Sequence, residues 1–189
     1  MKVQSHLMRG RIALLFAALF SVIATAQSAS SPSQQNTESG CRSFVQSFYD
    51  WYVPLALREQ SEKAWDIALR RKPRLFEHQL VVLIQSDSDA QRKAEELVGL
   101  DFDPFLNSQD PSEQFGVKSV DKKSYTCLVT VDGFSSGIKR EELVAEVRFT
   151  NNRWQFSNFY YADGENRHDL MGLLRRFAAD RQSDNNASK

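Results

Sequence analysis

Histidine and cysteine are scarce in this sequence, which has three histidines and two cysteines among 189 residues. A structural zinc site needs clustered Cys or His ligands. Outside the first 26 residues the only histidines are His78 and His168, which have no paired spacing and are far along the chain from either cysteine. The sequence also lacks a Gly-x-Ser-x-Gly turn, a phosphate-cradling glycine loop and a dinucleotide fingerprint. No metal or cofactor is therefore predicted.

A net charge is also lacking, since 24 basic residues balance 24 acidic residues. Nucleic-acid binding normally requires a clearly basic face, so we predict no nucleic-acid partner. The basic side chains between Arg70 and Arg74 lie close in sequence to Glu62 and Glu77. We interpret this basic run as a solvated helix end rather than an anion site.

Long apolar runs are absent except near the start, where thirteen residues from Ile12 to Ala24 carry no charge. Basic residues precede this run, which ends in Ala24 and is followed by the small residues Thr25 and Ala26. The run is shorter than the ~20 residues that a spanning helix needs, and this arrangement is typical of a cleavable secretory signal. We predict a signal peptide over residues 1–26, cleaved near Ala26. The mature chain is then periplasmic or secreted and has no transmembrane segment; an uncleaved anchor is the alternative.

The two cysteines, Cys41 and Cys127, both remain after this cleavage. In an oxidising compartment an even pair is more often bridged than free. We predict a disulfide between them, which closes a long loop and would stabilise the fold by up to about 4 kcal/mol. A buried unpaired thiol at Cys127 is the alternative.

The two ends of the mature chain have little apolar character. Residues 27–40 are rich in Ser and Gln and contain no aromatic or large aliphatic side chain. Such a segment cannot bury enough apolar surface to become ordered, so it is predicted to be a flexible tether. Residues 182–189 are predicted to be a disordered tail. Residues 41–181 then form a single domain of ordinary size.

Helical periodicity marks the first half of this domain. One face of the first expected helix carries apolar residues at i, i+4, i+7, i+8 and i+11, namely Phe44, Phe48, Trp51, Tyr52 and Leu55. Pro54 is expected to bend or end this helix, because proline cannot donate the interior hydrogen bond. A second helical region is expected from residue 65 to about residue 96, with a restart after Pro73 and an interruption at residues 87–89.

The period changes to two in the second half. Strands are expected over residues 116–120, 125–131, 143–150 and 154–161. Asn151 and Asn152 tolerate positive φ, so Leu143 to Tyr161 is predicted to be a β-hairpin. A short amphipathic helix over residues 170–177 follows. Helices followed by antiparallel strands predict an α+β fold, with the amino-terminal helices packed on one face of a curved sheet.

Three stretches, FVQSFYDWYVP, LDFDPFLNSQD and RWQFSNFYY, resemble in this order and spacing the bacterial family of unknown function numbered 3828. The resemblance covers about Phe44 to Phe177. It implies a small exported protein or lipoprotein with the cone-like fold of cystatin-like, nuclear-transport-factor-like and ketosteroid-isomerase-like proteins. Some members carry a lipid-bearing cysteine that has no counterpart here. The family has no settled activity, so the resemblance assigns no catalytic residue.

The stretch LDFDPFLNSQD begins with the Asp101 and Asp103 spacing of a calcium loop. Such a loop needs glycine at its sixth position and glutamate at its twelfth, where this chain has Leu106 and Ser112. A calcium site is therefore not predicted. Because Asp and Asn accept backbone hydrogen bonds in many turns, our first interpretation is a structural tie, with Phe105 among its apolar anchors.

Recognition is the alternative interpretation of the same stretch, which would then form one wall of a binding site at the cone mouth. Tyr and Trp on the opposite wall would supply contact area and a polar group at little entropic cost. The candidate binding residues are Tyr49, Trp51, Asp101, Asp103, Asn107, Asp110, Trp154, Asn158 and Tyr160.

These features favour an exported, non-catalytic binding or accessory module that recognises an envelope protein or polymer. One alternative is an inhibitor or immunity protein that presents an acidic and aromatic loop. The other is a small isomerase or dehydratase in which a buried carboxylate acts as base, with Asp50, Asp101 and Asp103 as candidates. The enzyme hypothesis predicts a closed apolar pocket that holds one carboxylate with a raised pKa.

Overall fold

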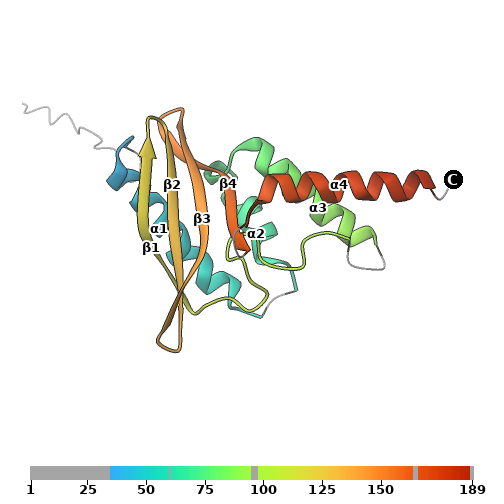
Figure 1. Cartoon of the computed structure of the whole chain (residues 1–189), viewed down its shortest axis with the longest axis horizontal. Helices are drawn as coiled ribbons and strands as arrows, with labels where there is room; N and C mark the ends of the chain where they lie inside the picture. The colour runs from blue at the N-terminus through green and yellow to red at the C-terminus, as the bar shows by residue number, and fades with distance from the viewer. Residues whose placement is uncertain (1–34, 60, 95–97, 164–165, 188–189) are drawn as a thin grey trace, which may run out of the picture.

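The computed structural model describes residues 35–187 apart from 60, 95–97 and 164–165 (Figure 1). The predicted signal peptide and most of the predicted tether lie outside the described residues. The elements are α1 (Glu38–Ala56), α2 (Ala64–Arg71), the 3-10 helix η2 (Pro73–Leu75), α3 (His78–Lys93), β1 (Gln114–Lys123), β2 (Thr126–Ser135), β3 (Ile138–Thr150), β4 (Arg153–Asp163), β5 (Asn166–Asp169) and α4 (Leu170–Ala187). The α+β prediction is confirmed. In the described part of the chain, no helix combines the length and the apolar character needed to cross a bilayer.

Helix α1 begins where Thr37 caps it. The Thr37 hydroxyl oxygen accepts a hydrogen bond of 3.0 Å from the amide of Gly40, and Glu38 places a negative charge in the first turn. The helix ends at Ala56, soon after Pro54 removes a backbone donor. Residues 38–40, predicted as part of the tether, are therefore helical.

The strands form one antiparallel sheet in the order β1-β2-β3-β4-β5. Asn151 and Asn152 adopt φ of 53° and 58° in the turn between β3 and β4, and Val144 pairs with Tyr160 further along. The predicted hairpin from Leu143 to Tyr161 is thus confirmed. Register shifts interrupt the β1–β2, β2–β3 and β3–β4 pairings. Such irregularities bend and twist strands, and the sheet curves beside α1 (Figure 1).

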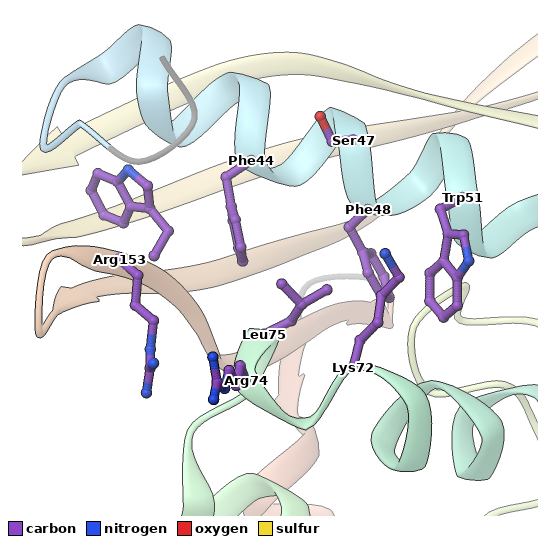
Figure 2. Close-up of a pocket in the computed structure, with 9 residues that line it drawn as sticks. Phe44, Ser47, Phe48, Trp51, Lys72, Arg74, Leu75 and Arg153 are labelled. Carbon is purple, nitrogen blue, oxygen red and sulfur yellow. The ribbon is translucent and has the colours of Figure 1, made fainter. Parts of the chain in front are cut away.

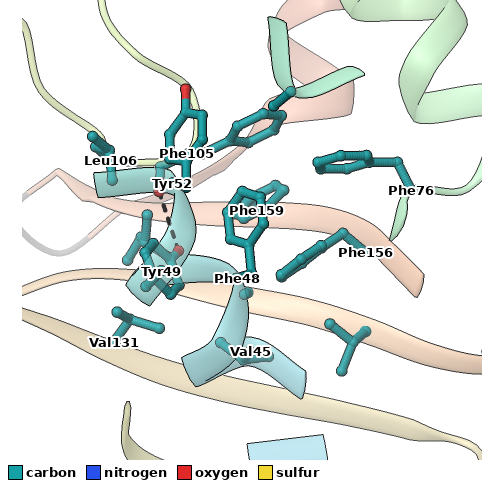
Figure 3. Packing of buried hydrophobic residues seen from close by; sticks show 14 of the residues in the cluster. Val45, Phe48, Tyr49, Tyr52, Phe76, Phe105, Leu106, Val131, Phe156 and Phe159 are labelled. Carbon is teal, nitrogen blue, oxygen red and sulfur yellow. Dashed lines mark hydrogen bonds between the residues drawn. The ribbon is translucent and has the colours of Figure 1, made fainter. Parts of the chain in front are cut away.

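An aromatic core fills the space between α1 and the sheet (Figure 3). The ring of Phe48 lies 5.0 Å from the ring of Tyr52 within α1 and 4.7 Å from the ring of Phe156 in β4. Phe105 packs 5.1 Å from both Phe76 and Phe159. Each such pair stabilises the fold by about 0.5–1.5 kcal/mol beyond the area that it buries. The core therefore fixes α1 against β4.

Helix α3 is continuous, so the expected interruption at residues 87–89 is absent. Asp87 instead lies buried inside the helix. Its carboxylate accepts hydrogen bonds from the amide of Leu100 at 3.0 Å and from Arg181 of α4 at 2.9 Å. Helix α4 runs to Ala187, which corrects the predicted disordered tail, because residues 182–187 are helical.

Cys41 of α1 and Cys127 of β2 are free thiols, which corrects the predicted disulfide. Both side chains are fully buried. Their mutual hydrogen bond, together with burial, raises the pKa of Cys41, and the same hydrogen bond lowers the pKa of Cys127. The two thiols therefore lie in contact across the α1–β2 interface without a covalent bond.

Candidate functional site

The stretch LDFDPFLNSQD is a structural tie. The carboxylate of Asp103 accepts hydrogen bonds from the Tyr52 hydroxyl at 2.6 Å and from the amide of Phe105 at 2.9 Å. The amide of Asp103 donates to the carbonyl of Ser108 at 2.9 Å, which closes the turn. Phe105 and Leu106 are fully buried. This segment therefore anchors the connection between α3 and β1 to the core.

The other predicted residues near this stretch do not share one pocket, since Asp101 borders one hollow and Asp110 borders another. Asp101 and Asp110 are exposed. Asn107 adopts φ of 52° and donates from its side chain to the carbonyl of Glu142 at 2.9 Å, so it ties the turn to β3. Tyr49 is buried, and its hydroxyl donates to the carbonyl of Phe105 at 3.1 Å. Tyr49 and Asn107 thus have structural roles.

Asn158 and Tyr160 lie on the opposite side of β4 from the core. Ser157 is an extra residue in β4, because Phe156 pairs with Val147 while Asn158 pairs with Glu146. Since successive strand residues alternate between faces, this bulge turns Asn158 and Tyr160 away from the face that carries Phe156. The sequence pattern, which placed all of these residues on one face, is wrong at this point.

Both residues are engaged in this outward position. Asn158 donates to Asp169 at 3.0 Å and accepts from the amide of Met171 at 3.2 Å, at the start of α4. The Tyr160 hydroxyl donates to Glu146 at 2.6 Å. Burial opposes ionisation of Glu146, but the hydrogen bonds from Tyr160 and Ser157 outweigh it and lower its pKa. This network holds α4 against the sheet.

Trp51 and Trp154, in contrast, line the same pocket, between α1, η2 and the start of β4 (Figure 2). The cavity measures about 340 Å³. Its lining residues are Phe44, Ser47, Phe48, Trp51, Lys72, Arg74, Leu75, Arg153 and Trp154. Two of the predicted site residues are therefore brought together, although 103 positions separate residue 51 from residue 154.

The pocket has an apolar interior that the core holds in place. Phe44, Phe48 and Trp51 project into it from one face of α1 (Figure 2). The ring of Phe44 packs 5.0 Å from that of Phe156. Trp154 is buried, and its indole nitrogen donates to the carbonyl of Gln35 at 2.9 Å. The pocket floor is thus formed before any ligand arrives.

Three cationic side chains flank this interior. Lys72 places its ammonium group 4.6 Å from the ring centre of Trp51. Arg74 enters from η2 and Arg153 from β4 (Figure 2). Across the described residues, Lys72, Arg74 and Arg153 form no ion pair with a carboxylate. The lining itself contains no acidic residue.

Sequence reasoning missed these cations. Within the basic run, Arg70 does pair with Glu62 as the neighbouring glutamates indicate. Lys72 and Arg74 instead face the pocket, because the chain turns at Pro73 into η2. The basic run is therefore not merely a solvated helix end. The clue available in the sequence to a turn that presents these cations was Pro73, which has a basic residue on either side.

Of the three candidate bases, only Asp103 is buried, since Asp50 and Asp101 are exposed. Burial raises the pKa of Asp103 to about 6, while hydrogen bonds from Tyr52 and Phe105 act in the opposite direction. Asp103 borders a separate hollow of about 480 Å³ beside Trp65 and Phe102. One carboxylate with a raised pKa is therefore present, but both of its oxygens already accept hydrogen bonds.

Metal-binding clusters are also absent from the described residues, which contain no group of three Cys, His, Asp or Glu side chains arranged to hold an ion. No family model, curated protein or solved structure matches this chain. The resemblance to the family of unknown function numbered 3828 stays a prediction. A fold does not by itself determine a function, so the chemistry of the site is the evidence for what this protein binds.

Proposed function

We propose that this protein is an exported, non-catalytic binding module that recognises an envelope protein or polymer through the pocket between α1, η2 and β4. The observation that carries this proposal is the meeting of Trp51 and Trp154 with three unpaired cations in one preformed cavity. Aromatic and arginine side chains are the groups that most often dominate binding energy at recognition sites.

The lining supports binding rather than covalent chemistry. It contains no carboxylate, histidine or cysteine. A serine nucleophile needs a hydrogen-bonded base, and among the described residues Ser47 forms no hydrogen bond to Lys72, the one lysine of the lining. Lys72 rests on the Trp51 ring. The pocket therefore offers contact area and positive charge but no activated nucleophile.

Packing also favours tight recognition at this place. Phe48 contacts Phe76 at 5.8 Å and Phe156 at 4.7 Å between ring centres, so the floor cannot collapse without disturbing the core. A site that is ordered before binding loses little conformational entropy when it is occupied. The exposed side chains of Lys72 and Arg74 then supply the adjustable rim.

Capture from an envelope extract tests the proposal. The bait is the chain without residues 1–26. It is compared with two variants, Trp51→Ala and Ser47→Trp. Ser47 is exposed, so a tryptophan at this position fills the mouth of the pocket without removing a core contact. Tyr125→Ala is the control, because Tyr125 is exposed at the turn between β1 and β2. Both pocket variants should lose the partner that wild type and control retain, while their far-ultraviolet circular dichroism stays unchanged. Equal recovery by all four proteins contradicts the proposed site.

Asp103 favours a second candidate function, a small isomerase or dehydratase. A buried carboxyl with a pKa of about 6 can act as a base near neutral pH. To do so it must release the hydrogen bond from Tyr52 or from Phe105. Proton exchange at the α-carbon of added ketones or hydroxy acids, abolished in Asp103→Asn, would favour this candidate. Identical exchange in the variant would remove it.

A further inference from the structure

We infer that the pocket lined by Trp51 and Trp154 takes an anionic group, carboxylate or phosphate, carried directly on one apolar ring or short apolar chain. This inference rests on the proposed binding function and names the ligand class of the same site. It follows from the charge of the rim, the size of the cavity and the polar groups that the lining lacks.

Charge is the first argument. Lys72, Arg74 and Arg153 all line one cavity, and no acidic residue lines it. Arg74 and Arg153 lie near each other, whereas Lys72 lies beside Trp51 (Figure 2). Guanidinium groups bind carboxylates and phosphates with two parallel hydrogen bonds. An anion at this rim would therefore find two guanidinium groups, those of Arg74 and Arg153, in the lining of the same cavity.

Size is the second argument. The cavity of about 340 Å³ lies at the small end of the range of roughly 300–1,000 Å³ typical of ligand pockets. Phe44, Phe48 and Leu75 form apolar walls. Such a space accommodates one ring or a short chain beside the anionic group. A long acyl chain or a polymer segment would remain mostly outside.

The composition of the lining argues against a saccharide. Sugar hydroxyl groups lose hydrogen bonds to water on entering a pocket, and each unpaired one is unfavourable. Carboxylates and side-chain amides are the usual partners, but this lining has no Asp, Glu, Asn or Gln. Ser47 is its only neutral side chain with a hydroxyl group. Lys72, Arg74 and Arg153 can donate to sugar oxygens, but Ser47 is the only side chain of the lining with an oxygen that could accept from sugar hydroxyl groups. An apolar ring needs no such acceptors.

Titration with small probes tests the inference, with tryptophan fluorescence and calorimetry as readouts. The anionic probes are 3-phenylpropionate and phenyl phosphate, the neutral match is 3-phenylpropanamide, and glucose 6-phosphate supplies the anion without the apolar ring. The anionic group could belong to a small acid or to the carboxyl end of a protein chain. The peptide Ala-Ala-Phe, tested with a free and with an amidated carboxyl end, distinguishes these two sources. We expect both anionic aryl probes to bind about 10-fold or more tightly than the amide, as a charge-assisted hydrogen bond implies.

Variants locate the effect. Arg74→Gln should weaken the anionic probes about 10-fold and leave the amide unchanged, and Arg153→Gln should do the same. Arg175→Gln is the matched control, because Arg175 is exposed on α4 and does not line the pocket. Since Arg74 is exposed, its replacement keeps the test valid even if Arg153→Gln unfolds.

The outcomes separate this inference from the proposed function. Failure of every anionic aryl probe to bind, equal affinity for the amide, or tighter binding of glucose 6-phosphate overturns the ligand class. If envelope capture still depends on Trp51 in that case, the proposed function survives. Anion binding that is unaffected by Arg74→Gln and Arg153→Gln also overturns the inference, since the anion would then lie elsewhere.

Discussion

Tyr52 donates a hydrogen bond of 2.6 Å to the carboxylate of Asp103, and both side chains are buried. The bond joins α1 to the connection between α3 and β1. Two effects raise the pKa of Tyr52 well above its usual range: burial is the larger, and the charge of Asp103 is the next. Tyr52 therefore stays protonated and remains a donor, while Asp103 changes its ionisation within the physiological range.

The pH dependence of stability should report Asp103. Burial raises its pKa from 3.8 to about 6, so its stabilising contribution is full below pH 3.8 and is lost as the pH rises through 6. Relative to Asp103→Asn, the free energy of unfolding of the wild type should fall by up to about 3 kcal/mol across this window. Urea unfolding at pH 4 and pH 7 measures it. A difference between the two proteins that does not vary with pH contradicts the assignment.

Removal of the hydroxyl group tests the other partner. Tyr52→Phe leaves one Asp103 oxygen without a donor inside the core. The free energy of unfolding at pH 7 should decrease by about 1–3 kcal/mol, with a smaller decrease at pH 4, where Asp103 is protonated. Tyr125→Phe is the control because its ring is 62% exposed. Equal stability of the two variants would show that the hydrogen bond is unimportant.

The role of LDFDPFLNSQD as a tie predicts a large effect at Phe105. Its ring is fully buried among Phe48, Tyr52, Phe76 and Phe159. Phe105→Ala should reduce the free energy of unfolding by about 3–5 kcal/mol. Phe102→Ala, at a partly buried ring, should reduce it less. Similar, small losses for both variants would favour an exposed recognition loop instead.

Oxidation should join the two thiols. Cys41 and Cys127 are hydrogen-bonded to each other but fully buried, so refolding the reduced protein from urea in the presence of oxidised glutathione should bridge them with loss of two hydrogens and reduction of the oxidant to its thiol. The bridge should raise the free energy of unfolding by up to about 4 kcal/mol. Mass spectrometry with and without reductant, and urea unfolding of each form, measure this. Cys127→Ala should show neither change, and a persistent dithiol in wild type would contradict the prediction.

The fold could be predicted from local sequence patterns because these patterns agree with the tertiary structure. The Asn151-Asn152 turn and the flanking alternation predict the hairpin correctly, since positive φ and period two act within a few residues. Ser157 marks the limit of this reasoning. The bulge at Ser157 arises from pairing with β3, and a shift of one residue reverses every later side chain, which misplaced Asn158 and Tyr160.

The pocket could be predicted only in part for a similar reason. Trp51 and Trp154 stand out because tryptophan is a common recognition residue, and three occur in the chain. The convergence of Lys72 and Arg74 with Arg153 depends on how η2 meets β4, which no local pattern encodes. Nearby glutamates also made the basic run look neutralised, although within the described part of the chain the partner of Glu62 is Arg70 rather than Lys72 or Arg74.

Indole resonances offer the most direct test of the pocket as the binding site. The chain has three tryptophans: Trp51 and Trp154 line the pocket, whereas the Trp65 indole donates to Ser88 at 3.4 Å in a separate region. In a nitrogen–proton correlation spectrum, titration with 3-phenylpropionate should shift the indole signals of Trp51 and Trp154 and leave that of Trp65 in place. A shift of Trp65 alone, or no shift at any of the three, would contradict the account.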